Sequence, residues 1–178
     1  YELDKKLSVP LYTLDHLIKT NKINTNDTGE IIKLDSQGAE KAILQGAQNT
    51  LSQNTSCIIC ESSFFTPYHD ACLFTDIETI LPKQDFQFYG FVDLKFRSTK
   101  RLDKKKSIGR ERMMQADAVF FKDPFDNKEG FKQTSKRQIA VTFTKALVLG
   151  YFDFCLEILD HWDVDSSEKE SLKKIILD

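Results

Sequence analysis

Apolar residues recur along this chain at two different spacings, and together these spacings predict an α/β domain. A short apolar run at Ile31–Leu34 ends in Asp35, and apolar residues then follow at helical spacing from Ala39 to Leu51. A second run, Cys57–Glu61, is almost continuously apolar, which is typical of a strand buried on both faces. A strand, a helix and a strand in this order predict two parallel neighbours joined by a crossover.

The segments on either side extend this core. Thr13 predicts the N-cap of a short helix. After the second strand, Phe74–Leu81 has helical spacing, and Pro82 is expected to end or kink that helix. The aromatic-rich segment Phe86–Phe96 and the segment Ala116–Lys122 predict two more strands, paired as an antiparallel hairpin with a long loop.

The carboxyl-terminal third has a different, wholly helical pattern. Asp126–Ser135 predicts a linker, and apolar residues from Ile139 onward predict one or two helices broken near Gly150. Ser166 predicts the cap of a last short helix. We therefore expect residues 1–125 to form an α/β unit and residues 126–178 to form a linker and a helical tail.

The net charge, the apolar runs and the cysteine spacing each argue against one class of function. The formal charge of −2 gives no electrostatic reason to expect nucleic acid as a partner, and no apolar run is long enough to span a membrane. Cys57 and Cys60 form a C-x-x-C, but residues three apart on a strand point to opposite faces, so a metal or redox pair is not expected there. Buried free thiols indicate a reducing compartment and hence a cytoplasmic location.

Several blocks of this sequence resemble the FkbM family of S-adenosylmethionine-dependent methyltransferases. The family pattern combines a Pro-x-x-Thr-Leu-Asp block, a Lys-x-Asp-x-x-Gly-x-Glu block, a strand that ends in Glu and a late Asp-x-x-Phe strand. The matching segments occur in the right order, at Val9–Leu17, Ile32–Glu40, Leu44–Ala47, Glu61–Phe64 with Pro67 and Tyr68, and Gln115–Phe120.

The resemblance implies both a fold and an activity. It implies a partial Rossmann-like sheet of class I methyltransferases, covering strands four to seven with the last pair antiparallel, followed by the helical tail. It implies S-adenosylmethionine as cofactor and O-methylation of a hydroxyl on a carbohydrate or small-molecule acceptor. The seven glycines are scattered, and none forms the family's glycine-rich cofactor loop. Such a partial sheet exposes the edge of its first strand, which is a possible homo-oligomer interface.

The residues that end the two parallel strands are the leading candidates for chemistry. Asp35 and Glu61 are expected to face one cleft, where one of them orients or deprotonates the acceptor hydroxyl. A magnesium ion bridging the two carboxylates is an alternative. The resemblance adds Asp35 and Ser36 as cofactor contacts. The competing structural interpretation is that Asp35 only caps the following helix, and that Glu40 only compensates its dipole.

The loop after the second strand supplies further candidates. Phe64, Tyr68 and His69 are expected to bind the acceptor, with His69 as a possible general base. The alternatives are that Phe64 packs against the next helix and that His69 is simply solvated. Lys33 interrupts an apolar strand and is expected to pair with Glu40, Asp117 or another carboxylate.

Two other functions compete with the methyltransferase interpretation of the sequence. A non-catalytic remnant that kept the sheet but lost the cofactor half would also lack the glycine loop. A nucleotide- or nucleic-acid-binding module would use the basic run from Lys100 to Arg112, although a solvated hairpin loop explains that run as well.

Overall fold

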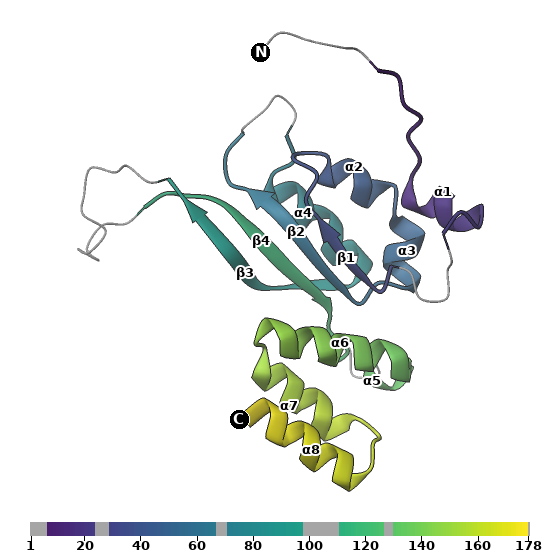
Figure 1. The fold of residues 1–178 in the computed structure, drawn as a ribbon, viewed down its shortest axis with the longest axis vertical. Coiled ribbons are helices and arrows are strands. Elements are labelled where there is room, and N and C mark those ends of the chain that lie inside the picture. Colours follow the sequence, from purple (N-terminus) through teal and green to yellow (C-terminus); the bar gives the residue numbers. More distant parts are fainter. Residues whose placement is uncertain (1–6, 24–28, 67–70, 98–110, 127–129, 178) are drawn as a thin grey trace.

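A computed structural model describes residues 7–23, 29–66, 71–97, 111–126 and 130–177, and it contains one four-stranded mixed sheet with helices on both sides (Figure 1). The order of strands in the sheet is β1-β2-β4-β3. The elements follow one another as α1 (Leu14–Lys19), β1 (Ile31–Leu34), α2 (Glu40–Gln45), α3 (Gln48–Gln53), β2 (Cys57–Ser63), α4 (Phe74–Ile80), the 3-10 helix η1 (Leu81–Gln84), β3 (Phe86–Phe96), β4 (Met113–Lys122), α5 (Gly130–Gln133), α6 (Lys136–Leu149), α7 (Phe152–His161) and α8 (Ser166–Leu177).

The strand pairing confirms the expected topology. β1 and β2 are parallel, with Leu34 opposite Cys60, so Asp35, directly after β1, lies beside Glu61. β2 continues for two residues to Ser63, so the prediction that this strand ends at Glu61 is wrong. β3 and β4 form the antiparallel hairpin. β4 lies between β2 and β3 and also pairs antiparallel with β2, and it begins at Met113, three residues before the predicted start.

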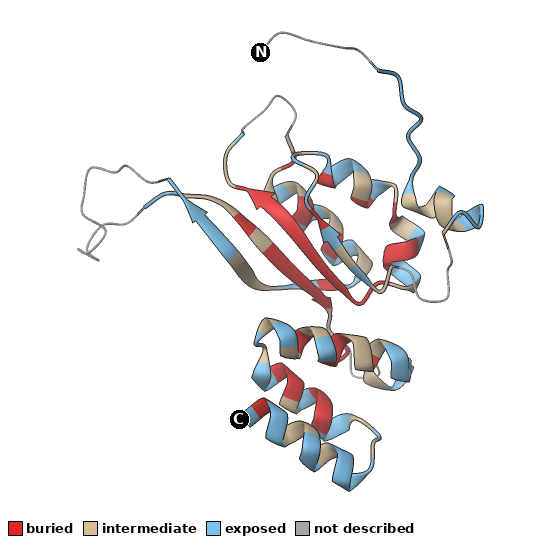
Figure 2. Cartoon of the chain, viewed as in Figure 1, coloured by how far each residue is buried: buried red, intermediate tan, exposed pale blue. Residues whose placement is uncertain are grey.

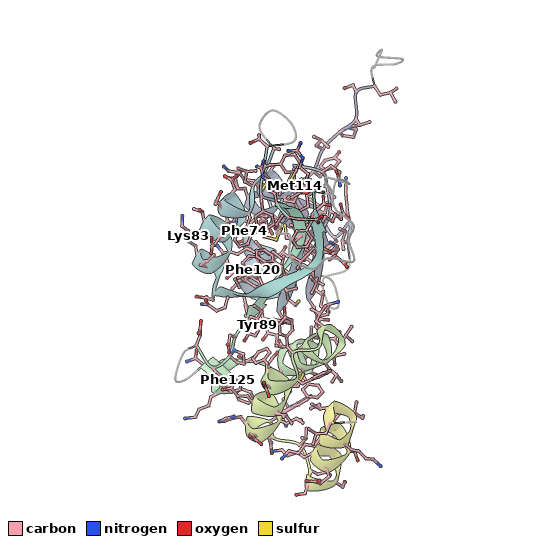
Figure 3. All side chains as sticks on the ribbon, turned by 90° about the vertical axis from the view of Figure 1, so that its left-hand side faces the viewer. Phe74, Lys83, Tyr89, Met114, Phe120 and Phe125 are labelled. Carbon is pink, nitrogen blue, oxygen red and sulfur yellow. The ribbon has the colours of Figure 1, made fainter. Side chains whose placement is uncertain are left out.

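β2 is buried on both of its faces, as its apolar run predicts, whereas much of β3 is exposed (Figure 2). Ile58 and Cys60 face a core that is completed by α2, α3 and α4, whereas Cys57 and Ile59 face a second core that is completed by the carboxyl-terminal helices. The two cysteines therefore point to opposite faces, and both thiols are free. In Figure 3, Phe74 and Phe120 lie within the first core, and Tyr89 and Phe125 lie where the sheet meets the helical tail.

The single helix expected from Ala39 to Leu51 is instead two short helices, so that prediction is wrong in its continuity. α2 ends with Gly46 as its C-cap, and α3 begins two residues later. A side chain at Gly46 would place its Cβ 2.8 Å from Cγ2 of Thr13, which is too close. The missing side chain at Gly46 therefore leaves room for Thr13, which is confirmed as the N-cap of α1.

Asp15 on α1 holds the start of α3. Its carboxylate accepts hydrogen bonds from the backbone N–H groups of Asn49 and Thr50, each at 2.9 Å, and from both of their side chains. Burial pushes the pKa of Asp15 upward, but the hydrogen bonds led by those from the Asn49 and Thr50 backbone outweigh it, so the pKa is lowered overall. The aspartate of the first family block thus has a structural role.

We expect Asp15→Ala to lower the free energy of unfolding by about 1–2 kcal/mol at pH 7, as for other lost helix caps. Because the folded-state pKa is lowered, this contribution is present above the unfolded-state pKa and is lost as the pH falls through the folded-state value. Urea denaturation from pH 7 down to about pH 3 should show the difference from wild type shrinking. Glu170→Ala, at an exposed position of α8, is the control, and an equal loss in both variants would contradict the role of Asp15.

The helical tail is anchored at the amino ends of β1 and β2, the end of the sheet away from Asp35 and Glu61 (Figure 1). Gly150 ends α6 in the left-handed conformation, which confirms the predicted break. The linker contains the short helix α5, and α8 is capped by Asp165, which accepts hydrogen bonds from the backbone N–H groups of Ser167 and Glu168, so the predicted cap Ser166 is wrong.

Two further features concern the contact of the domain with a second copy and with a membrane. Among the described residues, no strand pairs with the outer edge of β1, and a homo-oligomer through that edge stays a prediction. No helix in the described part of the chain combines the length and the apolar character needed to cross a membrane.

Candidate functional site

The carboxylates of Asp35 and Glu61 share one hydrogen-bond donor, the side-chain amide of Gln37. Nε2 of Gln37 lies 3.1 Å from Oδ1 of Asp35 and 2.9 Å from Oε2 of Glu61. Glu61 is buried, with 8% of its side chain exposed, whereas Asp35 is exposed. The structure therefore brings the two predicted acids together near the carboxyl ends of β1 and β2, and it places between them Gln37, a residue not predicted from the sequence.

The second oxygen of Glu61 is held by the hairpin. Nζ of Lys95 on β3 lies 3.2 Å from Oε1 of Glu61, and this hydrogen bond raises the pKa of Lys95. Both oxygens of Glu61 are thus engaged. Asp35 differs, because within the described residues its Oδ2 accepts no hydrogen bond. Asp35 is therefore the carboxylate that is available to a ligand.

A bulge in β3 places Lys95 on this side of the sheet. Val92 pairs with Asp117, but the next pair is Lys95 with Gln115, so β3 uses one more residue than β4 between these pairs. Asp93 lies in the bulge with φ of +50°. Without the extra residue, side-chain alternation would turn Leu94 rather than Lys95 toward Glu61.

Lys33 and Asp117 form a second ion pair beside the first. Nζ of Lys33 on β1 lies 2.6 Å from Oδ2 of Asp117 on β4, which confirms one of the expected pairings. Its position in an apolar strand suggested that Lys33 is buried. In the structure it is not, since 43% of its side chain is exposed. The ion pair spans β2, which lies between β1 and β4, and it is next to the side chains of Asp35 and Glu61.

The turn after β1 is held together by Glu40. This side chain is only 2% exposed, and its carboxylate accepts hydrogen bonds from the backbone N–H and the hydroxyl of Ser36, both at 2.8 Å, and from the backbone N–H of Gly38 at 2.9 Å. The N-cap residue of α2 is Ala39, without a side-chain bond. The interpretation of Asp35 as the helix cap is therefore wrong, and Glu40 does more than compensate the helix dipole.

Two cavities adjoin these side chains. An open cavity of about 450 Å³ has Asp35 in its wall, and it is lined by Lys33, Asp35, Asp93, Leu94, Lys95 and Asp117. Behind Gln37 and Glu61 lies a much smaller cavity of about 10 Å³, which is room for about one water molecule. The larger cavity is wide enough to admit part of a small-molecule ligand, and its wall consists mostly of charged hydrogen-bonding groups.

The other predicted ligand contacts are placed only in part. The ring of Phe64 packs against Phe74 at 5.7 Å and against Phe91 at 5.2 Å between centroids, so the packing alternative describes its contacts. Tyr68 and His69 lie outside the described residues, as does most of the basic run from Lys100 to Arg112. Their proposed roles stay predictions.

The fold and these side chains together define a class of protein. Parallel strands with acids at their carboxyl ends and helices on both faces are typical of α/β domains that bind ligands at that edge. The comparison with protein families is more specific, because residues 1–88 match the family described as the methyltransferase FkbM domain. This confirms the resemblance over the stretch that contains Asp35, Gln37 and Glu61, and it identifies the stretch as part of a methyltransferase-type domain. Comparison with curated proteins and with solved structures gave no match.

The family implies S-adenosylmethionine as methyl donor. Few of the described residues near Asp35 have free groups that could contact this cofactor. Asp35 offers a free carboxylate oxygen to a hydroxyl or a cation. Ser36 does not fit, because its backbone N–H and its hydroxyl are both bound to Glu40. The N–H of Gly38 is bound in the same way, so the turn presents no open set of backbone donors to a cofactor. No group of three or more potential metal ligands is found among the described residues.

Proposed function

We propose that this chain forms the acceptor side of a methyltransferase that methylates a hydroxyl group of a carbohydrate or small molecule. The observation that supports this proposal best is the convergence of Asp35 and Glu61 on Gln37, beside an open polar cavity and within the segment that matches the family. In this proposal the four strands correspond to strands four to seven of a class I sheet. The free thiols are in keeping with a cytoplasmic enzyme.

Asp35 is the group that acts on the acceptor. Its Oδ2 accepts a hydrogen bond from the acceptor hydroxyl and takes the proton as that oxygen forms its new bond to carbon. When bound, the cofactor would supply an electrophilic methyl group, and its sulfur would keep the electron pair of the broken sulfur–carbon bond. Leu94 lines the same cavity and offers an apolar contact to the carbon skeleton of the acceptor.

Glu61 has a different part in this mechanism. Because Gln37 and Lys95 occupy its two oxygens, Glu61 holds Gln37 beside Asp35 and does not take the proton itself. The ion pair between Lys33 and Asp117 neutralises charge at the rim of the cavity. Asp35 takes the proton and Glu61 does not, because of these two acids only Asp35 has, within the described residues, a carboxylate oxygen without a hydrogen bond.

The proposal places most cofactor contacts on protein outside these residues, and calorimetry tests this. Titration of the 178-residue chain with S-adenosylhomocysteine is expected to show no saturable binding below about 1 mM, because Ser36 and Gly38 have no free donors. Micromolar binding would contradict this expectation and would show that the chain makes a cofactor site by itself.

Transfer of a labelled methyl group tests the function itself. An enzyme that combines this chain with a cofactor-binding half is expected to label hydroxyl-bearing acceptors from a panel of sugars and polyols. If cofactor binds to that enzyme and no acceptor is labelled, the non-catalytic remnant becomes the better interpretation.

A further inference from the structure

Gln37 has an unusual backbone conformation at the point where its side chain meets both acids. Its φ of +57° lies in the left-handed region, which costs energy for a residue with a side chain. Glu40 fixes the residues on both sides of it, through Ser36 and Gly38. The turn is therefore held in the one arrangement that carries the Gln37 side chain over the ends of β1 and β2.

The contacts identify which end of the Gln37 amide faces the acids. Both partners are carboxylate oxygens, which accept hydrogen bonds, so the NH₂ group must point toward them and each of its two hydrogens can serve one acid. Nζ of Lys95 serves the remaining oxygen of Glu61. The amide nitrogen of Gln37 thus occupies the place between the carboxylates where a bridging divalent cation would have to lie.

We infer that Gln37 is a positioning residue that takes the place of a bridging metal ion at this site. Its amide holds Asp35 and Glu61 in a fixed relation, and together with Lys95 it offsets their mutual repulsion. The magnesium-bridged alternative does not fit this arrangement, because a cation at that place would have to displace the amide nitrogen of Gln37. The inference rests on the proposed function only for the role of the two acids, and its tests need neither cofactor nor acceptor.

The first test follows the side-chain amide of Gln37 by NMR. Gln37 and Gln87 on β3 are both exposed, but within the described residues the side-chain amide of Gln87 makes no hydrogen bond. The amide resonances of Gln37 are therefore expected to lie away from those of Gln87 and to exchange more slowly with solvent. Glu61→Gln and Asp35→Asn are each expected to move the Gln37 resonances and to leave those of Gln87 unchanged. A Gln37 amide that resembles Gln87 and does not respond to either variant would overturn the inference.

The second test asks whether the nitrogen of Gln37 keeps a cation out. In a titration with Mn²⁺ followed by water proton relaxation, wild type is expected to show no saturable site below about 1 mM. Gln37→Glu keeps the size of the side chain and brings a third carboxylate to the pair, and it is expected to bind Mn²⁺ at least about tenfold more tightly than wild type. Gln87→Glu is the matched control and is expected to behave as wild type.

Each outcome of this titration bears on the inference. Saturable binding of Mn²⁺ to wild type that disappears in Asp35→Asn would show that the acids form a metal site after all. A Gln37→Glu variant that stays folded and gains no affinity would show that the Gln37 nitrogen does not occupy the place of a cation. Because methyl transfer is not measured, neither result depends on whether the proposed activity is correct.

Discussion

Asp35→Asn is expected to slow methyl transfer by about 100-fold or more, because an amide cannot accept the proton of the acceptor hydroxyl. The substitution keeps the shape of the side chain, and its oxygen can still accept the hydrogen bond from Gln37. The fold should therefore survive. The measurement is the initial rate of labelled methyl transfer in the combined enzyme described above, together with thermal unfolding of the variant.

Glu61→Gln is the informative comparison. Its effect should be smaller, about tenfold, because Glu61 acts by positioning other groups. Asp163→Asn, at a side chain that is 94% exposed in the helical tail, should leave the rate unchanged. If Glu61→Gln were the more damaging of the two substitutions, the roles assigned to Asp35 and Glu61 would have to be exchanged.

The two acids were predictable from sequence because their positions depend only on local pattern. An apolar run that ends in an acid predicts where a strand stops, and two such parallel strands bring their ends to one edge of the sheet. The register of Leu34 against Cys60 places Asp35 and Glu61 side by side, although β2 continues to Ser63, so only Asp35 comes directly after its strand. The antiparallel hairpin and the break at Gly150 were predictable for similar local reasons.

The donors around the acids were not predictable in the same way. Lys95 reaches Glu61 only because β3 contains a bulge, and the strand pattern of Phe86–Phe96 does not show where the extra residue lies. Gln37 depends on a left-handed turn, for which the following Gly38, itself at φ of +113°, is the only local signal. The split between α2 and α3 comes at Gly46, which Thr13, a residue far away in the sequence, approaches closely.

The side chain of Glu40 connects this turn to the stability of the whole domain. We expect Glu40→Ala to lower the free energy of unfolding by about 3 kcal/mol, because it removes a buried acceptor and leaves three donors of Ser36 and Gly38 without a partner. The loss should be visible as a lower midpoint in urea denaturation at pH 7. Glu78→Ala, at an exposed position of α4, is the control and should change the midpoint little.

A second variant separates the charge of Glu40 from the geometry of the turn. Glu40→Gln keeps one acceptor oxygen and is expected to lose less stability than Glu40→Ala, but its NH₂ group cannot accept from Ser36 or Gly38, so the turn should loosen. That loosening should appear at Gln37, whose amide resonances should move toward those of an exposed glutamine. If Glu40→Ala were as stable as Glu78→Ala and the Gln37 amide kept its resonances, the turn would be held by its own backbone. The positive φ of Gln37 would then need a different explanation from the one given by the buried carboxylate.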